Sequence, residues 1–131
     1  MTGIDTNVIV RYISQDDPRQ SPTATKLIES LSVDEPGFIA MVVIVELAWV
    51  LERSYHSSRK EIARVLESLL QTKELIIEHA ELVAQALRMF SAGRADYSDC
   101  LVERCADAAG CQYTVTFDHV AAAAAGMRLI K

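Results

Sequence analysis

Short strand-like runs alternate along this chain with longer segments whose apolar side chains recur at helical spacing. The strand-like runs are residues 2–5, DEPGFIA at 34–40 (a turn and then a strand), ELIIE at 74–78, QYTVTF at 112–117 and MRLI at 127–130. Helices are predicted just after residue 5, from about 21 to 31, at 42–54, from 58 onward, at 79–91 and at 97–109. This alternation predicts an α/β fold with a central, mostly parallel sheet flanked by helices.

Local signals mark three helix ends. Ser21, followed by Pro22, predicts a helix start, and Ser58 with Glu61 three residues later predicts a capping box. Gly110 predicts a helix end, because glycine readily adopts the left-handed conformation that closes many helices.

Length and composition favour one domain spanning residues 1–131. Hydrophobic residues make up 50% of the chain, enough for one sizeable core, and no repeat or linker divides it. No signal peptide precedes Thr2, and no apolar run reaches the ~20 residues that cross a bilayer, so we expect a soluble cytoplasmic protein. Cys100, Cys105 and Cys111 lack a metal-binding spacing and are expected to be buried and reduced.

One acidic residue has an unusual setting, because Glu46 lies among nine apolar residues in VVIVELAWVL at 42–51. The segment predicts a largely buried helix, in which Trp49 belongs to the core or, as the alternative, to an interface. An unpaired carboxylate that is buried either destabilises the fold or takes up a proton. We therefore expect Glu46 to bind a cation or to pair with another group.

Four other acids fall near predicted strand ends or helix starts. Asp5 and Asp118 end strands, while Asp96 and Asp99 begin the helix at 97–109. In open parallel sheets, ligands bind where strands end and the following helices begin. Carboxylates gathered there repel one another, and Mg²⁺ or Mn²⁺, which prefer oxygen ligands, would relieve that repulsion.

Each acid also has a plainer explanation when it is taken alone. Asp5 suits a cap of the turn at DTN, and Asp118 suits a turn residue. Asp99 suits an N-cap or a partner of the helix dipole, and Glu46 suits a paired structural carboxylate. The metal hypothesis rests on their joint placement.

Four segments carry a family resemblance, in order along the chain: GIDTNVIVRYI, VVIVELAWVLERSY, GRADYSDCLVERCADAAGC and TVTFDHVAAAAAGMRLI. With them the chain resembles the PIN domain family, and most of all its VapC-type toxin ribonucleases of bacterial toxin–antitoxin systems. The resemblance implies a PIN-like fold. The positions that match the family's acidic quartet are Asp5, Glu46, Asp99 and Asp118, with Asp96 as an additional acid and Thr6, Asn7 and Thr116 as supporting polar residues.

The resemblance implies a Mg²⁺- or Mn²⁺-dependent endoribonuclease that hydrolyses phosphodiester bonds of structured RNA, such as tRNA or ribosomal RNA. It also implies a homodimer and a cognate small antitoxin, which would lie in an apolar groove lined by the first helices and the helix of Trp49. The net charge of −5 gives no basic footprint for RNA. Phosphate contacts would therefore fall to a few cations, with Arg11 and Arg94 as candidates.

Two other functions stay open. In the first, the domain is a catalytically silent module that binds RNA or protein, although the complete acidic quartet argues against this. In the second, it is a metal-dependent phosphohydrolase acting on another phosphoester. A haloacid-dehalogenase phosphatase would need a second Asp where Asn7 stands, which disfavours that class.

Overall fold

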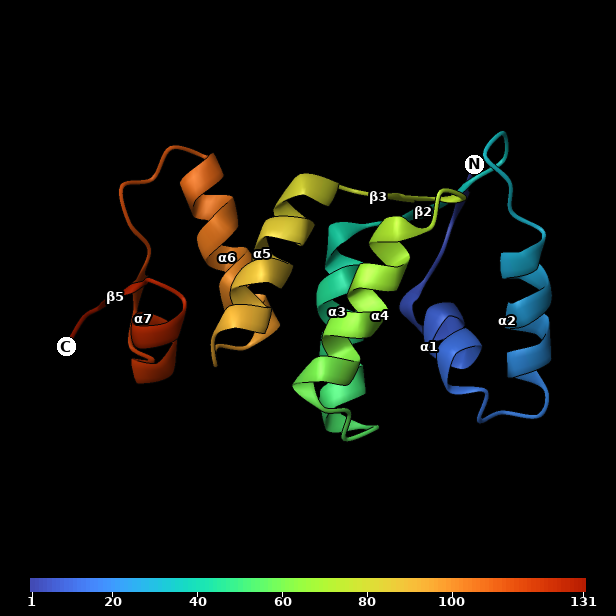
Figure 1. The fold of residues 1–131 in the computed structure, drawn as a ribbon, viewed down its shortest axis with the longest axis horizontal. Coiled ribbons are helices and arrows are strands. Elements are labelled where there is room, and N and C mark those ends of the chain that lie inside the picture. Colours follow the sequence, from blue (N-terminus) through green and yellow to red (C-terminus); the bar gives the residue numbers. More distant parts are fainter. The chain divides into compact units, whose positions relative to one another are not determined.

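The computed structural model describes residues 1–131 and divides them into two compact units, Met1–Ala80 and Glu81–Lys131 (Figure 1). Each unit combines helices with a small parallel sheet, so the predicted α/β class is confirmed. Within the units, the strands form a three-stranded parallel sheet in the first and a two-stranded parallel sheet in the second. None of the helices has the length and apolarity needed to cross a membrane.

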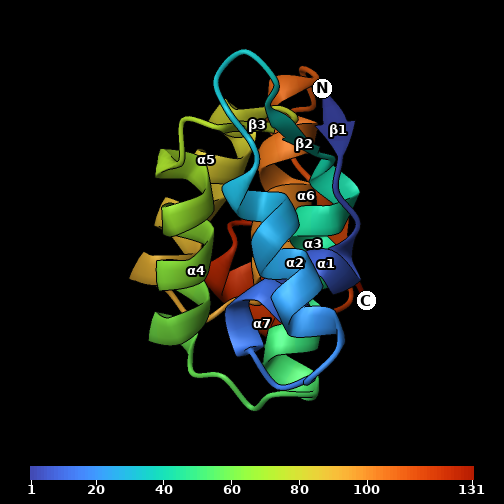
Figure 2. The ribbon, with the colours of Figure 1, turned by 90° about the vertical axis from the view of Figure 1, so that its right-hand side faces the viewer.

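The first unit contains three strands and four helices. They are β1 (Thr2–Gly3), α1 (Thr6–Ser14), α2 (Gln20–Glu29), β2 (Gly37–Ile39), α3 (Met41–Arg53), α4 (Arg59–Gln71) and β3 (Leu75–Ile77). The strands lie in the order β1-β2-β3, all parallel, with Thr2 opposite Gly37 and Ile39 opposite Ile77. Helix α1 packs against both α2 and α3, and α3 packs against α4; Figure 2 shows α2 in front of α1. The core of this unit therefore lies between the helices and beneath the short strands.

Helix α4 follows its sequence signals closely. The side chain of Ser58 accepts a hydrogen bond from the backbone N–H of Glu61 over 3.1 Å, and the Glu61 carboxylate accepts one from the N–H of Ser58 over 2.7 Å. This reciprocal pair confirms the predicted capping box. Ile62, Leu66 and Leu69 are buried on the inner face of the helix.

Helix α2 begins differently from the prediction. The predicted N-cap, Ser21, is 2% exposed and lies inside the first turn. The N-cap residue is Arg19, whose side chain makes no capping hydrogen bond; Asp17 Oδ1 accepts from the N–H of Arg19 over 2.9 Å and of Gln20 over 2.7 Å. A carboxylate two to three residues upstream reaches both free N–H groups, which leaves the serine hydroxyl available to accept from the N–H of Asp17.

Helix α3 is buried along one face only, so the expectation of a largely buried helix is wrong. Ile44, Leu47, Ala48 and Leu51 face the core, while one stripe of the helix faces outward. Trp49 belongs to that outer stripe and is 48% exposed, with the Arg53 guanidinium 3.8 Å from its ring centroid. The tryptophan therefore makes a cation–π contact at the surface and does not lie in the core.

The second unit contains three helices and two strands. They are α5 (Ala80–Ala92), α6 (Tyr97–Ala108), β4 (Val115–Thr116), α7 (His119–Ala124) and β5 (Arg128–Leu129). Strands β4 and β5 pair in parallel, with Val115 opposite Arg128. The short helix α7 connects them and was not among the predicted elements.

Gly110 and the three cysteines, for which the sequence made predictions, all lie in the second unit. Gly110 has φ +94°, and its N–H bonds to the carbonyl of Asp107, so its role in ending α6 is confirmed. Cys100 is buried, Cys105 is intermediate and Cys111 is exposed. Burial is therefore confirmed for Cys100, whereas Cys111 lies after the helix end, where no apolar face covers it.

Candidate functional site

Two of the predicted acids, Asp5 and Glu46, line one cavity of the first unit. Its volume is about 410 Å³, and Thr6, Asn7, Arg11 and Tyr55 also line it. Strand β1 ends at Gly3, so Asp5 does not end the strand as predicted. It is the N-cap of α1, where its Oδ1 accepts from the N–H of Thr6 over 2.7 Å. Capping fixes the position of this carboxylate at the cavity wall.

Glu46 is exposed, which overturns the argument that it is buried among apolar residues. It lies on the outer stripe of α3, between Val42 and Trp49, because residues three or four apart share one face of a helix. Its carboxylate accepts a hydrogen bond from the hydroxyl of Thr6, which is 6% exposed. Thr6 is therefore a buried anchor on α1 that orients a carboxylate on α3.

Three further acids lie close together in the second unit. Asp99 is in the first turn of α6, Asp96 is the N-cap residue of that helix, and Asp118 is the N-cap residue of α7. Burial, together with the negative charges of Asp96 and Asp118, raises the pKa of Asp99. These carboxylates therefore repel one another in the metal-free protein.

Of the two aspartates at N-cap positions in this unit, one makes a capping hydrogen bond with its carboxylate and the other does not. Asp118 Oδ1 accepts from the N–H of Ala121 over 2.9 Å, and the N–H of Asp118 donates to the hydroxyl of Thr116 over 3.0 Å. Asp96 makes no capping hydrogen bond with its side chain. Its carboxylate is therefore not engaged by the helix that it precedes.

Arg11 is held in a network that sequence reasoning missed. Its Nη1 donates to Asp16 and to the Tyr55 hydroxyl, each over 3.1 Å, and its Nε donates to Gln20 over 2.8 Å. Hydroxyl groups of Ser14 and Tyr55 donate to Asp16 and lower its pKa to about 2. Asp16 is therefore ionised across the physiological range and keeps the guanidinium in place.

No sequence signal identified the partners of Arg11. Asp16 reads as part of a polar turn, and Tyr55 lies 44 residues from Arg11 along the chain. The other candidate phosphate contact, Arg94, is an exposed residue between α5 and α6.

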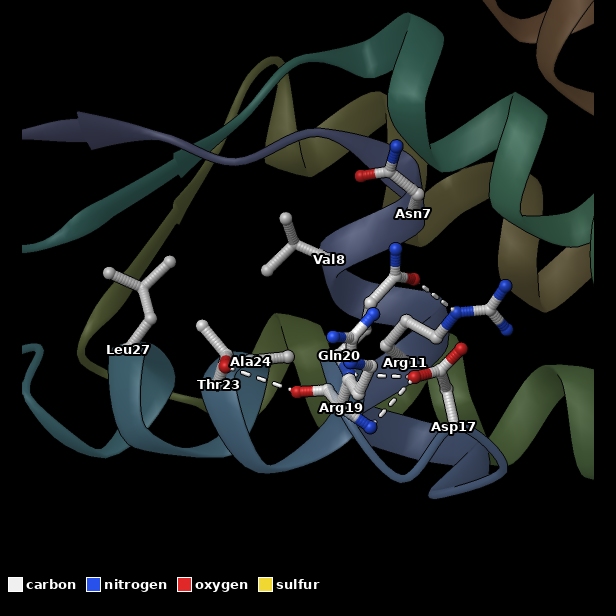
Figure 3. A pocket seen from close by; sticks show the side chains of 9 residues that line it. All are labelled: Asn7, Val8, Arg11, Asp17, Arg19, Gln20, Thr23, Ala24 and Leu27. Atoms are coloured by element: carbon white, nitrogen blue, oxygen red, sulfur yellow. Dashed lines mark hydrogen bonds between the residues drawn. The ribbon is translucent and has the colours of Figure 1, made fainter.

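A second cavity, of about 620 Å³, lies between α1 and α2 (Figure 3). It shares two lining residues, Asn7 and Arg11, with the cavity that holds Asp5 and Glu46. Nothing in the sequence pattern predicted it.

A third cavity, of about 310 Å³, is mostly apolar and is lined from α1, α2, α4 and the ends of β2 and β3; its residues include Ile9, Ile13, Ile28, Val65 and Leu69. No residue of α3 lines it. This apolar cavity is therefore lined by the first two helices and not by the helix of Trp49, whose ring contacts Arg53, and the location of the expected groove stays a prediction.

The donor set suits a hard divalent cation, because it consists of carboxylate oxygens and includes a crowded Asp99 whose pKa is raised. Within neither unit do three side chains of His, Cys, Asp or Glu form by themselves a group that could hold a metal ion. The structure brings Asp5 together with Glu46, and Asp99 together with Asp96 and Asp118. That both groups share one metal site stays a prediction.

Comparison with known proteins covers nearly the whole chain. The model of the PIN domain family matches residues 4–127, a span that includes all five predicted acids. A VapC ribonuclease of Aquifex aeolicus (strain VF5) is 28% identical over 118 residues, which cover 89% of this chain and 87% of that protein.

Proposed function

This chain belongs to the PIN domain family, and we propose that it is a Mg²⁺- or Mn²⁺-dependent endoribonuclease that hydrolyses phosphodiester bonds of structured RNA. The similarity to a VapC ribonuclease supports RNA as the substrate. The observation that carries the proposal is the setting of Asp99, whose pKa is raised by burial and then by the negative charges of Asp96 and Asp118 beside it. A bound cation removes this penalty, whereas a purely structural role for three adjacent carboxylates leaves it in place.

The metal ligands in this proposal are Asp5, Glu46, Asp96, Asp99 and Asp118. A divalent ion bound there supplies a more acidic water and stabilises charge that develops on the phosphate. The protein's own groups orient the ligands. The Thr6 hydroxyl holds the carboxylate of Glu46, and the Thr6 N–H holds that of Asp5.

Substrate phosphate is bound in this proposal by Arg11, with Arg94 as a second contact. Arg11 is suited to this role because Asp16 and Tyr55 fix its Nη1 at the wall of the cavity that Asp5 and Glu46 line. Arginine binds phosphate with a planar set of N–H donors, so a fixed orientation gives the contact a defined geometry.

The proposal extends to partners and location: a homodimer, a cognate small antitoxin and the cytoplasm. The apolar cavity on α1, α2 and α4 supports a bound protein segment, because its aliphatic lining favours apolar side chains of a partner. Binding of the antitoxin blocks access of metal and RNA. RNA cleavage that persists in a stoichiometric complex with the antitoxin would refute this part of the proposal.

The decisive experiment is cleavage of end-labelled tRNA and ribosomal RNA fragments by the antitoxin-free chain, with Mg²⁺ or Mn²⁺ and with EDTA. The test variant is Asp99→Asn. The matched control is Asp107→Asn, which removes an exposed carboxylate from the same helix, away from the acidic group. Loss of several kcal/mol of charge stabilisation corresponds to a decrease of about 100-fold or more in rate.

We expect metal-dependent cleavage by the wild type and the control, and a loss in Asp99→Asn. Cleavage that survives both EDTA and the Asp99 substitution contradicts the proposal. RNA binding without cleavage, equal in wild type and variant, indicates the catalytically silent module instead. Cleavage of DNA or small phosphoesters in place of RNA indicates another phosphohydrolase.

A further inference from the structure

The cavity between α1 and α2 is not used by the proposed metal site, yet it adjoins it. Its volume of about 620 Å³ lies within the usual range for small-ligand pockets, about 300 to 1,000 Å³. Asn7 and Arg11 line both this cavity and the one that holds Asp5 and Glu46. A polymer that reaches the acids can therefore continue directly into the second cavity.

Arg11 forms the boundary between the two cavities and is fixed from both sides. Asp16 and Tyr55 hold its Nη1, and the amide oxygen of Gln20 holds its Nε. Figure 3 shows the Gln20 amide with its oxygen toward Arg11 and its nitrogen directed away from it. Within the first unit, Nη2 of Arg11 and the amide nitrogen of Gln20 have no hydrogen-bond partner, so both donors are available to a ligand.

Arg19 is a second cation of this cavity. It lies one residue before α2, is exposed, and takes part in none of the ion pairs of the first unit. The nearest acid in sequence, Asp17, has its Oδ1 engaged by the backbone N–H groups of Arg19 and Gln20. The guanidinium of Arg19 is therefore available for an anion.

Val8, Ala24 and Leu27 supply the apolar part of the lining, and Thr23 and Asp17 are its other polar residues, with Asp17 Oδ1 already engaged by the N–H groups of Arg19 and Gln20. Two arginines, amide donors and an apolar surface together match the chemistry of a nucleotide, in which a charged phosphate adjoins a flat base and a ribose. A small anion would leave the apolar part of the lining without a contact, and an apolar peptide would leave the two guanidinium groups without a contact.

We propose that the cavity between α1 and α2 binds the nucleotide next to the cleaved bond, with Arg19 on its phosphate and Arg11 between this nucleotide and the acids. The inference rests on the proposed ribonuclease function and deepens it by assigning a substrate subsite. Because Arg19 contacts a phosphate that does not react, it contributes to RNA binding and not to the chemical step.

The test compares Arg19→Gln with Lys26→Gln. Lys26 is an exposed cation on the same helix that does not line the cavity, so it controls for the loss of one positive charge. Cleavage of the RNA that the wild type cuts is measured as kcat and KM from 50 to 200 mM salt. A third variant, Arg19→Lys, keeps the charge but removes the planar donor set.

For Arg19→Gln we expect KM to rise about five- to tenfold with little change in kcat, and the slope of log KM against log salt to fall by about one. Arg19→Lys should recover part of the loss, and Lys26→Gln should match the wild type. If Arg19→Gln and Lys26→Gln behave alike while the wild type cleaves RNA, the subsite is refuted and the ribonuclease proposal stands. If the wild type cleaves no RNA under any metal condition, both proposals fail.

Discussion

Replacing Tyr97 with Phe removes one buried hydroxyl and leaves the aromatic ring. Tyr97 is the first residue of α6 and is 3% exposed. Its hydroxyl donates to the carbonyl of Val83 on α5 over 2.9 Å, and its ring meets Phe90 edge-on with centroids 5.9 Å apart. The hydroxyl therefore ties the start of the helix that carries Asp99 to the neighbouring helix.

The expected loss in the free energy of unfolding of Tyr97→Phe follows from the one hydrogen bond that the substitution removes. An intramolecular hydrogen bond contributes about 1 kcal/mol net to the free energy of unfolding. For a chain of this length that loss lowers the melting temperature by about 3 to 6 °C. Tyr97→Ala removes the ring as well, including its contact with Phe90, and should cost about 3 to 5 kcal/mol.

The cost should also depend on pH in a defined direction. Burial, reinforced by Cys100 and Cys105, raises the pKa of Tyr97 above its ordinary value of 10.0. The folded state therefore keeps the proton while the unfolded state loses it, so the free energy of unfolding of the wild type falls as the pH rises above about 10. The Phe variant has no hydroxyl to titrate at this position, so it does not lose stability in this way, and the difference in free energy of unfolding between the two proteins narrows above about pH 10.

Urea denaturation followed by circular dichroism at pH 7, 9, 10 and 11 measures both effects. The other tyrosines are the same in the two proteins, so their titration cancels in the difference. A Phe variant as stable as the wild type at pH 7 would refute the contribution of the hydrogen bond. A difference that stays constant from pH 7 to 11 would refute the raised pKa.

Three other outcomes follow from the structure. Thr6→Val removes the hydroxyl that orients Glu46 and should slow RNA cleavage about tenfold. The free energy of unfolding should fall by about 1 kcal/mol or less, because the exposed carboxylate of Glu46 regains hydrogen bonds to water. Thr6→Ser should restore the rate, and a Val variant that cleaves RNA as fast as the wild type would contradict the role of the hydroxyl. In EDTA at pH 7, Asp99→Asn should melt at a higher temperature than the wild type, because burial and two neighbouring aspartates raise the pKa of Asp99 and its ionised form destabilises the fold. This advantage should vanish as the pH falls below 3.8, and a lower melting temperature at pH 7 would count against the repulsion. Ser58→Ala breaks the capping box with Glu61 and should lower the free energy of unfolding by about 1 kcal/mol without changing the cleavage rate per folded molecule. Equal urea midpoints for the variant and the wild type would show instead that the cap does not contribute to stability.

Features that depend on residues close together along the chain could be predicted from the amino-acid sequence. The alternation of strand-like runs with helical spacing predicted the α/β class and parallel strands. Ser58 with Glu61, and Gly110, marked helix ends correctly, because each acts on backbone groups within a few residues. The four segments with their acids also indicated the family that the comparison with known proteins shows.

Which face of an element points outward, and which distant side chains meet, depends on how the elements pack. The segment 42–51 is apolar almost throughout, so its pattern did not reveal that Glu46 and Trp49 lie on the exposed stripe of α3. The partners Thr6 and Glu46 are 40 residues apart in sequence, and Arg11 and Tyr55 are 44 apart. Such contacts arise when helices pack against one another, and packing depends on the shape of both surfaces at once. The periodicity of a single segment carries no information about the surface of its partner.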